Sequence, residues 1–222
     1  YDLPVHKRYS DLYIAQGGRR DWQQRWDPNW PLVDFLNVKY VITQLSLKSS
    51  NFKLIYDSGN FSVFENLDVF PRAYMVYDIE LVEDDNAILA KMIEEEVNLR
   101  KEVILEETLP LSEANSLGPT SDFSVAYVEY SNDRVVLKVT TEEAGMLVMS
   151  DLLTSGWTAQ IDGRKAKLYR ANYAYRAVFV PRGEHSIAFQ YSPVAFKIGA
   201  TMTLVGLVMI IVLPFGQVPK FL

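Results

Sequence analysis

Short runs of alternating apolar and polar residues follow one another through the second half of the chain. In one of them, Ile187, Phe189 and Tyr191 alternate with smaller or polar residues, as in a strand with one buried face. The dipeptide Asp162-Gly163 between two such runs is a strong hairpin signal. Runs at spacings near ten residues are typical of a sandwich. We therefore predict an antiparallel, jelly-roll-like β-sandwich at 122–193, with strands at 122–130, 134–140, 145–150, 157–161, 165–170, 174–180 and 185–191.

The first half of the chain has a mixed pattern. The runs FKLIYD (52–57) and FSVFEN (61–66) flank a good turn sequence and predict a hairpin. Apolar residues at helical spacing predict a helix near 84–97, with acids at its start where they favour the helix dipole. Strands are expected at 73–78 and 101–106. Residues 1–108 are thus predicted to form an α+β segment.

Residues 109–121 (LPLSEANSLGPTS) contain turn formers and lack periodicity, so we interpret them as a linker between two domains. The chain as a whole is predicted to be mainly β, with α+β character before this linker.

The pattern changes again at the C-terminus, where the run 198–215 contains no charged residue. As a helix its 18 residues would extend about 27 Å, close to the thickness of a bilayer core. We predict a transmembrane helix at 197–215. Gly199, Thr203 and Gly206 fall on one face of it, and small residues let helices approach closely in lipid. This face is predicted to pack against other membrane helices.

Composition narrows the possible functions. The hydrophobic share of 49% supports a folded core, and the absence of cysteine excludes disulfides and thiolate metal sites. The net charge of −6 and the lack of a basic face argue against nucleic acid as a partner. Ten acidic and three basic residues at 83–113 indicate a solvated helix and the loop that follows it.

The sequence offers little catalytic chemistry. His6 and His185 are too few and too isolated for a metal cluster, and no phosphate-binding glycine loop or nucleophile elbow is present. We therefore predict no catalytic residue, no metal site and no cofactor in this chain. One basic cluster stands out near the predicted membrane exit, and it could meet lipid phosphates or a lipid-linked phosphosugar. Its members are Arg164, Lys165, Lys167, Arg170 and Arg176.

Several segments together resemble the C-terminal part of YfhO-like bacterial membrane proteins. The resemblance covers roughly residues 35–215 and is most specific after residue 147. Its motifs include LNVKYVIT (36–43), Pro71-Arg72-Ala73-Tyr74, Ser150-Asp151, Gly156-Trp157, Asp162-Gly163, Asn172, Arg176-Ala177, Pro181, Gly183-Glu184-His185 and Tyr191-Ser192-Pro193. Thr154-Ser155 departs from the aromatic residue and proline expected before Gly156-Trp157.

The residues of these motifs are expected to be structural. Trp157 after Gly156 would fill the core, Asp162 and Gly163 would set a hairpin, and Tyr191 with Pro193 would end the last strand before the membrane.

The resemblance implies a multi-pass protein similar to GT-C glycosyltransferases. Such enzymes move a sugar from a polyprenyl-phosphate carrier to an acceptor outside the cytoplasmic membrane. Because the chain begins with Tyr1, we expect a longer protein of which this is an accessory part, with residues 1–195 on the outer face of a bacterial cytoplasmic membrane. The expected partners are membrane lipid, other transmembrane helices, a polyprenyl-phosphate sugar and a surface glycopolymer. The alternative is a membrane-anchored carbohydrate-binding or adhesion module without catalysis.

Overall fold

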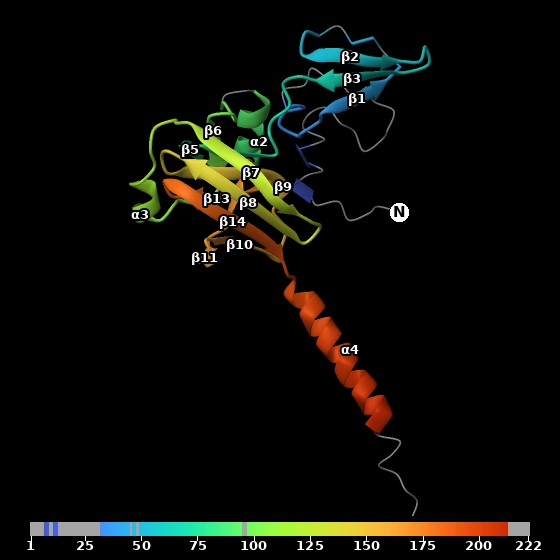
Figure 1. Cartoon of the computed structure of the whole chain (residues 1–222), viewed down its shortest axis with the longest axis vertical. Helices are drawn as coiled ribbons and strands as arrows, with labels where there is room; N and C mark the ends of the chain where they lie inside the picture. The colour runs from blue at the N-terminus through green and yellow to red at the C-terminus, as the bar shows by residue number, and fades with distance from the viewer. Residues whose placement is uncertain are drawn as a thin grey trace, which may run out of the picture.

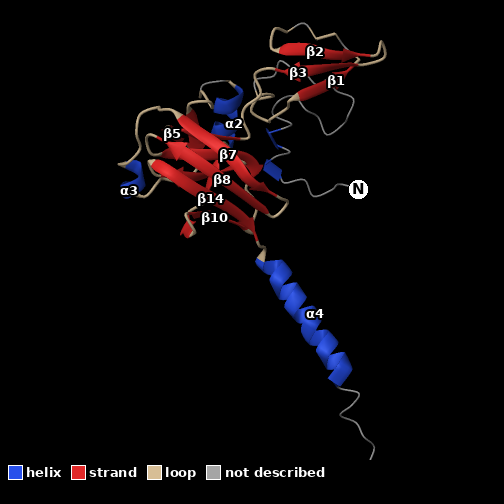
Figure 2. Ribbon diagram, viewed as in Figure 1, coloured by secondary structure: helices blue, strands red, loops and turns tan. Residues whose placement is uncertain are grey.

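Strands make up most of the folded part of the chain, and a long helix leaves it at the C-terminus (Figure 1, Figure 2). The computed structural model describes residues 7–8, 11–12, 32–44, 46–47, 49–94 and 97–212. Within them, three sheets have the strand orders β1-β3-β2, β11-β10-β14-β8-β7 and β4-β9-β13-β12-β6-β5. The prediction of a mainly β chain with antiparallel sheets is confirmed.

The smallest sheet consists of β1 (Tyr40–Thr43), β2 (Phe52–Asp57) and β3 (Ser62–Asn66). The predicted hairpin at 52–66 is confirmed, because β2 and β3 pair antiparallel across the turn. The Asp57 carboxylate accepts a bond from the Gly59 N–H at 2.9 Å, and Gly59 has a positive φ of 81°. Val41, Phe52 and Phe64 form its small core with Val33.

The five-stranded sheet comes entirely from the second half of the chain. Its strands are β7 (Phe123–Tyr130), β8 (Arg134–Thr141), β10 (Trp157–Ile161), β11 (Arg164–Ala166) and β14 (Gly183–Tyr191). All its neighbours pair antiparallel. The two edges are β11, a strand with two exposed basic residues, and β7.

The six-stranded sheet joins strands from both halves. They are β4 (Ala73–Val76), β5 (Asp78–Leu81), β6 (Glu102–Leu105), β9 (Gly145–Leu152), β12 (Tyr169–Ala171) and β13 (Tyr175–Val180). Helix α2 (Asp85–Ile93) connects β5 to β6, the only parallel pair among the described strands. The linker predicted at 109–121, which contains the short helix α3 (Leu111–Ala114), therefore separates strands that belong to one sheet. Strand β4 pairs with β9 and β6 pairs with β12, so two strand pairings connect the segments before and after this linker.

A shared core packs the two larger sheets face to face. Met75, Leu147 and Val178 from the six-stranded sheet meet Leu137 and Phe189 from the five-stranded one. Alternate residues of β13 point the other way: Tyr175 and Ala177 join a second core that α2 covers through Ile88 and Met92. The layers are thus sheet, sheet and helix.

Two predicted elements differ in extent. The helix expected at 84–97 is shorter, since α2 starts after Asp84, whose carboxylate caps the Ala87 N–H at 2.8 Å. The strand expected at 165–170 is divided. Its first part, β11, lies in the five-stranded sheet and its second, β12, in the six-stranded sheet. The chain crosses between the sheets at residues 167–168.

Helix α4 (Val194–Val212) follows β14 after Ser192 and Pro193 (Figure 1). Its large apolar side chains are exposed as far as Ile210; Phe196 and Met202 keep 74% and 70% of their surface in solvent. No helix in the described part of the chain combines the length and apolarity of a membrane span. The transmembrane helix predicted at 197–215 is therefore not confirmed. The helix begins earlier, directly after Pro193, and residues 213–215 lie outside the described residues.

Candidate functional site

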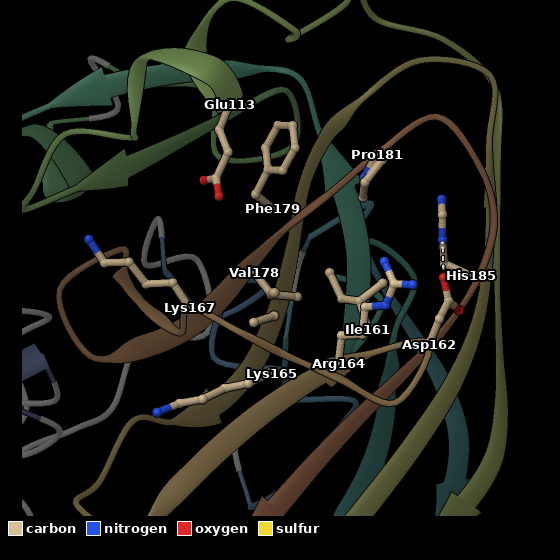
Figure 3. Close-up of a pocket in the computed structure, with 11 residues that line it drawn as sticks. Glu113, Ile161, Asp162, Arg164, Lys165, Lys167, Val178, Phe179, Pro181 and His185 are labelled. Atoms are coloured by element: carbon tan, nitrogen blue, oxygen red, sulfur yellow. Dashed lines mark hydrogen bonds and ion pairs between the residues drawn. The ribbon is translucent and has the colours of Figure 1, made fainter.

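A basic pocket opens beside the hairpin of β10 and β11 (Figure 3). Asp162 and Gly163 form its two-residue turn, and both have positive φ (50° and 76°), as a type I′ turn requires. The hairpin predicted from this dipeptide is thus present. The pocket encloses about 650 Å³ and is lined by Glu113, Ile161, Asp162, Arg164, Lys165, Ala166, Lys167, Val178, Phe179, Pro181 and His185.

One end of this basic pocket holds a carboxylate–imidazole pair. Asp162 Oδ2 lies 2.7 Å from His185 Nδ1, and Asp162 Oδ1 accepts the Ser186 N–H at 2.8 Å. The hydrogen bond from His185, together with that from Ser186, lowers the pKa of Asp162 below its ordinary value. These contacts connect the β10–β11 turn to the first residues of β14.

Three basic side chains line the same pocket. Lys167 forms an ion pair with Glu107 at 2.9 Å. The side chains of Arg164 and Lys165 form no hydrogen bond or close ion pair with any described residue, although the charge of Arg164 acts on the nearby Asp162. Figure 3 shows Lys165 and Lys167 extending away from the end of the pocket where Asp162 and His185 meet. With Glu113 as the other acid, the lining carries one positive charge in excess. This arrangement can attract an anion.

The structure brings together only three of the five basic residues that the sequence grouped. Arg170 lies on β12 and pairs with Glu106 at 3.6 Å, with its Nη1 buried and unpartnered. Arg176 lies on β13 and faces the inter-sheet core, where its side chain keeps only 1% of its surface in solvent. The neighbouring strands therefore separate Arg170 and Arg176 from the basic pocket.

Arg176 belongs to a second cluster, at the opposite end of β10 from the turn. Its Nη2 donates to Asp151 Oδ2 at 2.7 Å, and its guanidinium stacks 3.8 Å from the Trp157 ring centre. Arg72 donates to Asp151 Oδ1 from Nε and Nη2, at 3.0 and 2.6 Å. A β-bulge in the pairing of β9 with β13 places Asp151 between the two arginines.

Sequence reasoning gave Arg72 and Asp151 no functional role. Both stood in the family motifs, and Asp151 is a carboxylate within the apolar strand run LVMSDL. A charged residue in a buried strand is costly unless it is paired, and that was the available signal. No spacing rule could have identified its partners, which lie 79 and 25 residues away.

The structure places Trp157 and its neighbours at the junction of β14 and α4, and their structural role stays a prediction. Trp157 is half-buried, packs against the inter-sheet core and stacks on Tyr191 with ring centres 5.3 Å apart. Gly156 has φ of +105°, and a Cβ there would come within 3.0 Å of Tyr191 and Pro193. A side chain at position 156 would thus strain the turn where β14 meets α4.

The remaining predicted site residues lie on α4. A Cβ added at Gly199 or Gly206 would meet no atom within 4 Å, and Thr203 donates its hydroxyl to the Gly199 carbonyl at 2.9 Å. The face is open in this chain, and its packing role stays a prediction. Among the described residues, no cluster of three or more His, Asp or Glu side chains could hold a metal ion.

Part of the chain is similar to a known protein family. The family model of the bacterial membrane protein YfhO matches residues 120–203, from the start of the five-stranded sheet into α4. The resemblance recognised in the sequence is confirmed over this stretch, which is YfhO-like. Neither a search of curated proteins nor a search of solved structures finds a match.

Proposed function

We propose that this chain is the extracytoplasmic C-terminal domain of a YfhO-like membrane protein and that the apolar run 198–215 enters the membrane. The observation that carries the proposal is the junction of β14 and α4. Only Ser192 and Pro193 separate the last strand of the sandwich from a helix whose apolar side chains face solvent. Membrane lipid would cover that apolar surface, and the five-stranded sheet would then lie next to the membrane surface.

The aromatic pair at this junction supports the same placement. Trp157 and Tyr191 are register partners at the α4 end of β10 and β14. Tryptophan and tyrosine are enriched at the membrane–water interface, because their rings are apolar and their N–H or O–H groups can remain hydrated. Lys197 lies just beyond them on α4 and suits the headgroup region.

The basic edge of the five-stranded sheet adds an electrostatic argument. Strand β11 is the edge of the five-stranded sheet nearer to α4 in Figure 1, and its Arg164 pairs with Ile161 at the end of β10 away from the junction. Basic residues at an exposed edge discourage pairing with another strand. Near a membrane they also gain about 1 kcal/mol each from anionic headgroups. Arg164 and Lys165, which form no close ion pair with any described residue, would contribute most.

The finer function that we propose is sugar transfer by the whole protein from a polyprenyl-phosphate carrier to a cell-surface polymer. This domain would be accessory: it would cap the membrane part, and its basic pocket would hold the phosphate of the lipid-linked sugar. The family resemblance and the excess positive charge of the pocket support this role. Gly199, Thr203 and Gly206 would pack against other membrane helices of the same protein.

Membrane association is tested by flotation of the full chain with liposomes. We expect the chain to float, and the double substitution Leu204→Lys and Val208→Lys to abolish flotation because both side chains are exposed on α4. Leu111→Lys, on a leucine outside α4 that is even more exposed, is the control and should float. Flotation of the double variant would refute the role of α4.

The transferase role is tested in membranes that contain the complete protein, with a polyprenyl-phosphate sugar as donor. We expect Arg164→Gln with Lys165→Gln to raise the KM for the donor and leave kcat unchanged. Lys138→Gln, a basic residue paired with Glu184 elsewhere on the sheet, is the control and should change neither constant. Absence of sugar transfer by the wild-type protein would refute the enzyme role.

One observation favours the alternative of a carbohydrate-binding or adhesion module without catalysis. Tyr127 and Tyr130 on the edge strand β7 are half-exposed and form an edge-to-face pair 5.8 Å apart. Exposed aromatic rings of this kind can stack on sugars. Glycan binding that Tyr127→Ala weakens, without any transfer activity, would favour this function.

A further inference from the structure

Arg176 is a buried cation in which two donor nitrogens, Nε and Nη1, lack a hydrogen-bond partner. Its side chain lies between Trp157 and Phe189, with its guanidinium 3.8 and 5.2 Å from the two ring centres. Nη2 donates to Asp151, but neither Nε nor Nη1 has a hydrogen-bond partner. Buried donors are nearly always paired, because an unpaired one loses its hydration without replacement. Nε and Nη1 are therefore available to donate to a group that is not part of the chain.

The charges around Arg176 also favour an acceptor from outside the chain. A hollow of about 350 Å³ is lined by Arg72, Arg176 and a single acid, Asp151, so the lining carries one excess positive charge. The two Asp151 oxygens already accept three N–H groups from these arginines. Asp151 cannot satisfy the rest of the Arg176 fork, so an acceptor for Nε and Nη1 must come from outside these three side chains.

The hollow opens toward solvent beside Arg72. This side chain keeps 44% of its surface exposed and stacks 4.8 Å from the ring centre of Tyr130, on the edge strand β7. Arg72 precedes β4, the edge strand of the opposite sheet. Asn132 and Thr154 add neutral polar groups to the lining. A ligand could thus enter between the two sheet edges and reach Arg176 past Arg72.

We propose that this hollow binds an oxyanion, a phosphate or carboxylate group, held by the forks of Arg72 and Arg176. A guanidinium presents parallel N–H groups that match both kinds of oxyanion, and such charge-assisted bonds are the strong ones. The Arg176 Nε–H and Nη1–H would donate to the bound group. Asp151 is a positioning residue, since it holds both guanidinium groups in place. This site is separate from the basic pocket, so it stands whether or not the protein transfers a sugar.

The electrostatics of Arg176 fit an anion at this place. Burial lowers the pKa of Arg176, and the charge and hydrogen bond of Asp151 only partly offset that effect. A second anion would stabilise the charged guanidinium further. A neutral ligand would offset less of the free-energy cost of burying the charged guanidinium.

The test follows the arginine Nε–H resonances by NMR on the full chain in uncharged maltoside micelles. Inorganic phosphate, acetate and phosphatidylglycerol vesicles are the three probes, with chloride at matched ionic strength as the reference. Arg176→Lys assigns the Arg176 resonance. The test variant is Arg72→Gln at the rim, which leaves the buried Arg176 in place. Arg164→Gln in the basic pocket is the matched control.

We expect a saturable shift of the Arg176 resonance that Arg72→Gln weakens about tenfold or more, as loss of a charged hydrogen bond predicts. Arg164→Gln should leave the shift unchanged. Saturation by phosphate or acetate identifies a soluble oxyanion, and a shift with vesicles alone identifies a lipid headgroup. The proposal is overturned if no probe shifts the resonance, which would mean that water satisfies these N–H groups. It is equally overturned if Arg164→Gln, and not Arg72→Gln, removes the shift.

Discussion

Replacing Asp151 by Asn gives the sharpest test of how the sandwich is held together near α4. Asp151 is the one carboxylate between Arg72 and Arg176, and it accepts three N–H groups from them. Asparagine keeps the size and one acceptor oxygen but loses the charge. Arg176 would then be a buried cation without a counterion, with its side chain only 1% exposed.

The expected cost is about 3 kcal/mol of unfolding free energy. Removing one partner of a buried ion pair costs about 3–5 kcal/mol, since the other charge stays buried. The half of the interaction that involves Arg72 contributes little, because that side chain is 44% exposed and solvent screens it. Asp151 itself is 15% exposed, so some water reaches the site and the lower end of the range applies.

Urea unfolding followed by far-UV circular dichroism, in maltoside micelles, measures this cost. The matched control is Glu184→Gln, which breaks the exposed pair between Lys138 and Glu184 in the five-stranded sheet. That pair should contribute about 0–1 kcal/mol. If Asp151→Asn costs no more than Glu184→Gln, then Arg176 does not depend on Asp151 for its charge balance, and the reasoning is refuted.

Three further predictions concern the turn, the core and α4. Trp157→Ala should cost about 3 kcal/mol by the same measurement, since the half-buried indole supports Arg176 and Tyr191; an unchanged urea midpoint would contradict this. The pKa of Asp162 is lower in the folded state than its ordinary value of about 4, so its hydrogen bonds stabilise the fold fully at pH values above about 4. This stabilisation is lost as the pH falls through the lowered pKa. In carboxyl NMR titrations, His185→Ala should raise the Asp162 pKa toward its ordinary value, and an unmoved pKa would disprove the assignment. Gly206→Leu should disturb assembly of α4 with other membrane helices, seen as loss of co-purification, whereas normal assembly would argue against a packing face.

Local sequence patterns predicted most of the individual elements. The Asp162-Gly163 turn, the hairpin at 52–66 and the strands that became β7, β8, β9, β10, β13 and β14 follow from alternation and turn chemistry, which act between neighbours in the chain. The apolar C-terminal run likewise predicted a helix, although membrane spanning by α4 is not confirmed. Such signals report on a few adjacent residues, so they leave open which strands pair.

The composition of the sheets and of the two sites depends on contacts between distant parts of the chain. The run 165–170 looks like one strand, yet β11 and β12 pair in different sheets because each finds its partner there. Arg170 and Arg176 were separated from the other three bases of the cluster for the same reason. Arg72, Asp151 and Arg176 were brought together from three different parts of the chain. Pairing between distant strands depends on the burial of whole faces, a property of the assembled core that no single segment contains. Local sequence patterns therefore specify the elements and the available side-chain chemistry, while the packing of the two sheets specifies which charged groups meet.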